Sequence, residues 1–86
     1  MGLIESIINM KISNITGKEL LKYGQPFNIS VTESQADQIA AYLRSSKANI
    51  FNDEDRAKVI REIAKIAGPQ TAKKVNQVFL SFLNMK

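Results

Sequence analysis

The residue types that most often do chemistry at neutral pH are missing from this sequence. Its 86 residues include no histidine, no cysteine and no tryptophan. Imidazole and thiol groups are the usual proton shuttles, nucleophiles and soft metal ligands, so most catalytic mechanisms have no side chain to carry them. A serine or threonine nucleophile would also lack a histidine base. We therefore expect no catalytic residues, no cofactor and no bound metal, and infer that the protein is not an enzyme.

The acidic run Asp53, Glu54 and Asp55 is the densest group of potential metal ligands. It lacks the central glycine and the terminal glutamate of a calcium-binding loop, and three consecutive helical residues point in different directions. At the start of a helix, the same carboxylates compensate the positive end of the helix dipole. Helix capping is the simpler interpretation, and it predicts no metal site at this run.

Five cations form the best candidate surface for an anionic partner. Lys58, Arg61 and Lys65 follow one another at helical spacing, within about 60 degrees of arc on a helical wheel. Arg44 and Lys47 end the preceding predicted helix and extend the row if the two helices are neighbours. The formal charge of +4 permits a nucleic-acid partner without requiring one. Two glutamates interrupt the row, so a solvated helix face is the simpler interpretation and nucleic-acid binding is the second choice.

A short segment, Asn49, Ile50, Phe51 and Asn52, places two large apolar residues between two amides that favour turns. One interpretation makes Phe51 a core anchor just before the cap of a helix. The other makes the segment a loop that contacts a protein partner. The sequence alone leaves both open.

The elements that must position these residues are helices with clear start and stop signals. Thr16 with Glu19, and Thr32 with Gln35, have the spacing of reciprocal capping boxes, which predicts helices that begin at residues 17 and 33. Asn52 or the residue after it is the expected cap of another helix. Stop signals follow at residues 24 and 26 and at Gly68, for which we expect a left-handed cap.

Apolar residues recur with helical period along most of the chain. Residues 27–31 instead alternate, which predicts an extended linker that buries Phe27 and Ile29. The connections are short, and no convincing hairpin or domain boundary is present. The sequence therefore predicts an all-α fold, a compact single-domain bundle of about five short helices over residues 1–86. The expected helices cover about 3–12, 17 to 23 or 24, 33–46, 53–67 and 69–84.

The apolar surface of these helices exceeds what so small a domain easily covers. No apolar run approaches the roughly 20 residues of a membrane-spanning helix, and a chain without cysteine has none of the disulfides that hold small secreted domains together. We therefore expect a cytoplasmic protein with no membrane contact and no small-molecule substrate. The leading hypothesis is a non-enzymatic interaction module that binds a protein partner or forms a homo-oligomer.

Four stretches carry a resemblance to a known family, and together they cover roughly residues 15–82. They read ITGKELLKYG, ISVTESQADQIAAYLR, NIFNDEDRAKVIREIAKI and AKKVNQVFLSF. The chain resembles the small uncharacterised YqfT family of Bacillus-type bacteria, most closely at residues 19–21, 35–36 and 49–52. The resemblance implies a bacterial cytoplasmic protein. The family carries no assigned activity, so the resemblance transfers no functional residues.

Overall fold

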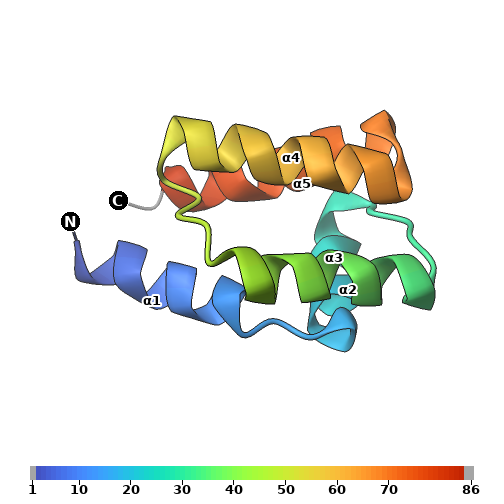
Figure 1. Ribbon diagram of the computed structural model, residues 1–86, viewed down its shortest axis with the longest axis horizontal. Coiled ribbons are helices and arrows are strands. Elements are labelled where there is room, and N and C mark those ends of the chain that lie inside the picture. Colours follow the sequence, from blue (N-terminus) through green and yellow to red (C-terminus); the bar gives the residue numbers. More distant parts are fainter. Residues whose placement is uncertain (1, 85–86) are drawn as a thin grey trace.

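The computed structural model describes residues 2–84, and every regular element in this range is helical (Figure 1). The all-α prediction is confirmed, and the boundaries of the five α-helices agree with the expected ones to within one residue. None of the described helices combines the length and the apolar composition needed to cross a membrane. The elements are α1 (Leu3–Ser13), α2 (Gly17–Gly24), the 3-10 helix η1 (Gln25–Phe27), α3 (Glu33–Ser46), α4 (Asp53–Ala67) and α5 (Pro69–Leu83).

The helices form two closely packed pairs, α2 with α3 and α4 with α5. Contact between α3 and α4 joins the pairs, and α1 packs on α3 (Figure 1). The radius of gyration is 11.7 Å, close to the about 12 Å expected for a compact globule of this length. The helix α3 is therefore central, because it touches both the other pair and α1.

The predicted capping signals explain where the helices begin. The amide of Glu19 donates to Thr16 Oγ1 at 3.2 Å, and the amide of Thr16 donates to Glu19 Oε1 at 3.1 Å. The same reciprocal pair joins Thr32 and Gln35, with both distances 3.0 Å. At α4 the cap is Asn52, whose Oδ1 accepts from the amide of residue 55 at 3.0 Å. Each cap satisfies amides that the first helical turn leaves without partners.

The extended linker expected at 27–31 is partly wrong. Residues 25–27 form η1, and Asn28 follows in the left-handed region with φ of 57°. Pro26 fixes its own φ near the helical value, which favours a 3-10 turn, and asparagine tolerates left-handed geometry better than most residues. Phe27 and Ile29 are half-buried, and Lys74 Nζ donates to the carbonyl of Asn28 at 2.8 Å. The segment thus turns the chain instead of extending it.

Gly68 alone connects α4 and α5, but not as the left-handed cap that the sequence suggests. Its φ of 93° and ψ of 161° lie in a region that is essentially restricted to glycine. Its amide donates to the carbonyl of Ala64 at 2.9 Å, which closes the last turn of α4. A β-carbon at Gly68 would meet no atom within 4 Å, so the requirement for glycine is conformational and not steric.

The core is apolar and draws on every α-helix. Among the described residues, no polar or charged residue is buried. Ile39, Ile50, Val59 and Ile63 are the largest side chains that solvent does not reach. The remaining buried apolar residues are Ile12, Ile15, Leu20, Ala36, Ala40, Leu43, Ala72, Val75 and Phe79.

Candidate functional site

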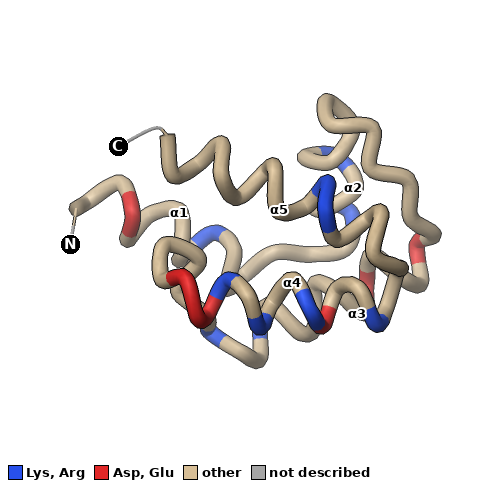
Figure 2. The backbone as a smooth tube through the Cα atoms, turned by 90° about the horizontal axis from the view of Figure 1, so that it is seen from above, with Lys and Arg blue, Asp and Glu red and all other residues tan. Residues whose placement is uncertain are grey.

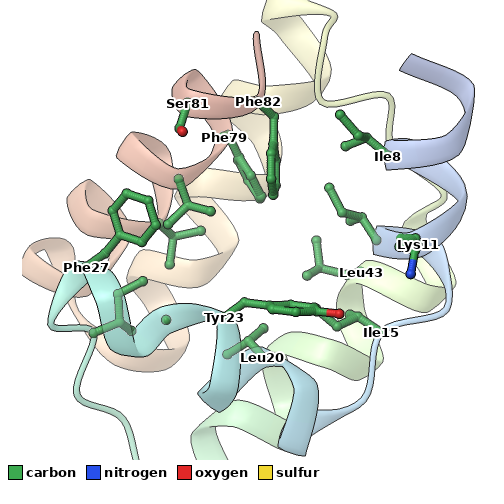
Figure 3. A pocket seen from close by; sticks show the side chains of 15 residues that line it. Ile8, Lys11, Ile15, Leu20, Tyr23, Phe27, Leu43, Phe79, Ser81 and Phe82 are labelled. Atoms are coloured by element: carbon green, nitrogen blue, oxygen red, sulfur yellow. The ribbon is translucent and has the colours of Figure 1, made fainter. Parts of the chain in front are cut away.

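An apolar pocket of about 410 Å³ opens between α1, α2 and α5 (Figure 3). Its walls include Ile8 from α1, Leu20 from α2, and Phe79 and Phe82 from α5. Leu43 of α3 also lines it, so four helices contribute to the cavity. We use "the apolar pocket" for this cavity.

The apolar pocket results from helices that face each other without packing together. The helix α1 packs mainly on α3, and α5 mainly on α4, with little contact between α1 and α5. The helix α2 has only eight residues and is too short to fill the space between them. Apolar side chains of α1 and α5 therefore line a gap, and Phe82 is only half-buried. No pattern in the sequence predicts this gap, because the gap depends on how the helices cross.

Three polar side chains line the apolar pocket: Lys11, Tyr23 and Ser81. Lys11 is the only charged residue in the lining, and its ammonium makes no hydrogen bond or ion pair with another described residue. The phenol of Tyr23 lies across the pocket with its hydroxyl toward α1, the side on which Lys11 lies (Figure 3). Ser81 lies on the opposite side, on α5. The helix α1 continues past Lys11 to Ser13.

A shallow second hollow of about 240 Å³ adjoins the rim at Lys11 and Tyr23. Glu19 lies in its lining and is the one acidic residue in the linings of the two hollows. The Oε1 atom of Glu19 accepts two hydrogen bonds from Thr16, one from the amide at 3.1 Å and one from the hydroxyl at 3.2 Å. The carboxylate therefore serves first to cap α2, and Lys11 has no ion-pair partner among the described residues.

The outward side of α1 is apolar and exposed. Leu3 is 77% exposed, Ile4 50%, Ile7 46% and Met10 62%. Leu3, Ile7 and Met10 are spaced at i, i+4 and i+7, so they form one stripe along the helix. We call these four residues the α1 face. Elsewhere in the described part of the chain, the exposed large apolar residues are Tyr23 at the pocket rim and Leu80 on α5.

The segment 49–52 joins α1 to α4 through hydrogen bonds. Asn9 Nδ2 on α1 donates to Asn49 Oδ1 at 2.8 Å, and the amide of Ile50 donates to Asn9 Oδ1 at 3.2 Å. The amide of Asn49 donates to Asp55 Oδ2 on α4 at 3.1 Å, while Asn52 caps the same helix. Ile50 is fully buried and Phe51 is half-buried. The structure thus explains the two amides by internal hydrogen bonds, and protein contact by this loop stays a prediction.

Sequence reasoning missed two residues of this junction. Asn9 gave no signal because its partners lie 40 and 41 positions away. Arg56 lies in the charged helix α4, yet its side chain is mostly buried: Nη1 donates to the carbonyl of Ile50 at 3.0 Å, and Nη2 pairs with Asp53 Oδ1 at 2.6 Å. The charge density at the start of α4 would have suggested a local ion pair, but not the contact with Ile50.

The five candidate cations do not all point to one place. Lys58, Arg61 and Lys65 are exposed along α4, where an acidic first turn is followed by basic residues with one acidic residue among them (Figure 2). Lys65 Nζ lies 3.7 Å from a carboxylate oxygen of that acidic residue, Glu62. Arg44 instead donates to the carbonyl of residue 15 at 2.7 Å. This carbonyl belongs to the connection between α1 and α2, on the side of α3 away from α4 (Figure 1). Lys47 caps the end of α3 with φ of 50°.

Comparison with known proteins bears on the whole chain. A family model described as "Protein of unknown function (DUF2624)" matches residues 1–83. A relative from Bacillus subtilis (strain 168), "Uncharacterized protein YqfT", is 35% identical over 82 residues, which cover 95% of this chain and 98% of the relative. No solved structure matches the chain. The resemblance to the YqfT family is thereby confirmed, and the chain belongs to the DUF2624 family of proteins of unknown function.

Proposed function

We propose that this protein is a non-enzymatic interaction module that pairs with a second copy of itself through the α1 face. The observation that carries the proposal is the exposure of four large apolar side chains along one side of a single helix. On a small domain, a contiguous exposed apolar surface of this kind usually marks an interaction site. The absence of histidine and cysteine from the sequence supports a role in binding over one in catalysis.

The charge pattern of α1 favours an antiparallel pair. No charged residue belongs to the stripe of Leu3, Ile7 and Met10, so a second copy meets it without repulsion. Lys11 borders the stripe at one end. In an antiparallel pair centred on Ile7, the two Lys11 residues stand eight helical positions apart, which is about 12 Å along the axis. At physiological salt, charges are screened over about 8 Å, so the two lysines repel each other weakly.

The expected pairing is weak, because the apolar area is small. Full burial of a leucine, isoleucine or methionine contributes about 1.5–3 kcal/mol. The four side chains retain about half or more of their surface, so covering them in both copies contributes on the order of 10 kcal/mol. Association itself costs about 4–15 kcal/mol in lost rigid-body freedom. We therefore expect a dissociation constant of about 10 µM or weaker.

Sedimentation velocity over a range of protein concentrations tests the proposal. The weight-average sedimentation coefficient should rise with concentration for the native chain. Ile7→Glu should hold the protein as a monomer, because each copy would then bring a charge to the centre of the pair. Ala41→Glu adds the same charge at an exposed position of α3 and should leave association unchanged. A native chain that stays monomeric at millimolar concentration would refute self-pairing.

Nucleic-acid binding by α4 is the second candidate. It is favoured by the exposure of Lys58 and Arg61 and by the lack of an ion pair for either among the described residues. It is weakened by the glutamates on the same helix and by the engagement of Arg44 elsewhere. Binding through these cations would weaken steeply with added salt, whereas self-pairing through the α1 face should not. We place the protein in the cytoplasm in either case, since it has no cysteine.

A further inference from the structure

We propose that the apolar pocket binds one fatty acid, with the alkyl chain inside the pocket and the carboxylate at the ammonium of Lys11. This ligand goes beyond the proposed self-pairing and beyond anything that the family description states. The alkyl chain would use the side of α1 that carries Ile8 and Ile12, and Lys11 lies between that side and the α1 face. The inference rests on the size of the cavity, the chemistry of its walls and the single charge at its rim.

The walls suit an unbranched alkyl chain. Apart from the three polar side chains and a glycine, the lining is entirely aliphatic or aromatic, and it includes Phe27, Phe79 and Phe82. A volume of about 410 Å³ lies toward the lower end of the about 300–1,000 Å³ typical of ligand pockets. If a methylene is taken as similar in size to a water molecule, which occupies about 30 Å³, the cavity holds about 14 heavy atoms. Dodecanoate has a matching number of carbon and oxygen atoms.

The rim suits an anionic head group. Lys11 provides the only charge in the lining and has no partner of its own among the described residues. The hydroxyl of Tyr23 points toward the same side and offers a second donor (Figure 3). A carboxylate accepts from both, and charge-assisted hydrogen bonds of this kind are the stronger ones. Glu19 in the adjoining hollow reduces the attraction, although its Oε1 already accepts from Thr16.

The shape of the pocket favours a single chain over a partner helix. An α-helix with its side chains is about 10 Å across and needs a groove that is open along its length. Here α1, α2 and α5 stand around the cavity, and Leu43 of α3 belongs to its lining (Figure 3). A narrow ligand enters such a space end-on and leaves its polar head at the rim, where Lys11 is exposed.

Calorimetric titration with dodecanoate, below the concentration at which it forms micelles, tests the inference. Dodecanoate should bind with one-to-one stoichiometry and raise the thermal midpoint by several degrees at saturation. Dodecanol, which has the same chain without the charge, should bind about five- to tenfold more weakly, as expected for one partly exposed charge-assisted contact. Absence of saturable dodecanoate binding overturns the proposal, and so does binding only to phosphatidylglycerol vesicles, which would indicate a membrane surface.

Three variants locate the ligand. Lys11→Gln should weaken dodecanoate binding about five- to tenfold and leave dodecanol binding unchanged. Lys58→Gln makes the same charge change on α4, away from the pocket lining, and should alter neither. Val78→Phe fills part of the cavity and should abolish binding of both ligands in a protein whose circular dichroism shows native helix content. Equal affinities of native protein and Lys11→Gln for dodecanoate refute the carboxylate contact, and native affinity in Val78→Phe refutes the pocket.

The proposed fatty-acid site and the proposed self-pairing can be tested separately, so the failure of one does not imply the failure of the other. Ile7→Glu removes pairing but changes no residue of the pocket lining, so it should bind dodecanol with native affinity. The uncharged ligand is the readout here, because a glutamate at position 7 stands one helical turn before Lys11 and would compete with a carboxylate for its ammonium. Loss of dodecanol binding in a folded Ile7→Glu protein would overturn the separate placement of the two sites.

Discussion

At the scale of single residues, the amide of Asn9 joins α1 to the segment that precedes α4. It donates to Asn49 Oδ1 and accepts from the amide of Ile50, and both contacts are partly buried. Replacing it should leave the Ile50 amide without a partner, which costs about 1–3 kcal/mol. We expect Asn9→Ala to lower the free energy of unfolding in urea by this amount.

Asn14→Ala is the matched control for Asn9→Ala. Its side chain makes one hydrogen bond, to the carbonyl of Met10 at 2.8 Å, in an exposed position. Water replaces a partner there, so the loss should stay within about 0.5 kcal/mol. Similar losses in the two variants would show that the contact between Asn9 and the 49–52 segment contributes nothing specific.

Gly68 carries a second prediction at this scale. Its φ of 93° suits glycine, while a β-carbon would have open space around it. Gly68→Ala should therefore lower the free energy of unfolding by about 1–3 kcal/mol through backbone strain alone. Gly2→Ala is the control, because Gly2 has φ of −81° and no atom within 4 Å of an added β-carbon. An unchanged thermal midpoint in Gly68→Ala would contradict the strain argument.

At the scale of the elements, the helices were predictable because their signals are local. A capping box needs only residues i and i+3, and the structure reproduces both pairs that the sequence suggested. The turn at η1 was not predicted, since the alternation of Phe27 and Ile29 imitates a strand. The geometry there depends on Pro26 and on the left-handed Asn28. Local sequence patterns thus predicted where the helices begin. They gave a wrong prediction at residues 27–29, where a turn contains alternating apolar and polar residues.

Thr32 tests how much these local signals stabilise the fold. It caps α3, the helix that contacts α1, α2 and α4. Thr32→Ala should lower the free energy of unfolding by about 1 kcal/mol, because the amide of Gln35 loses its acceptor. Thr32→Ser keeps the hydroxyl and should restore most of the loss. Equal midpoints for the alanine and serine variants in urea would show that the cap does not contribute.

At the scale of the whole molecule, the two candidate surfaces lie on either side of one helix. The α1 face is turned to solvent, and the apolar pocket lies between α1 and α5. Sequence periodicity could show that α1 is apolar on a wide arc, but not which part another helix covers. That depends on contacts between residues far apart in the chain, such as Asn9 with Asn49. The individual helices were therefore predictable, whereas the pocket between them was not.

This arrangement predicts that α1 is the least stable helix of the domain. Ile12 is its only buried residue among those described, whereas α3 buries Ala36, Ile39, Ala40 and Leu43. Local opening free energies follow the amount of buried apolar contact. In native-state hydrogen exchange, the opening free energy of the α1 amides should therefore lie well below the global free energy of unfolding. The opening free energy of the α3 amides should lie near the global value.

Asn9→Ala should accelerate exchange in α1 more than in α5, because it removes the hydrogen bonds that hold α1 to the 49–52 segment. Equal protection of α1 and α3 would show that α1 is an integral part of the core.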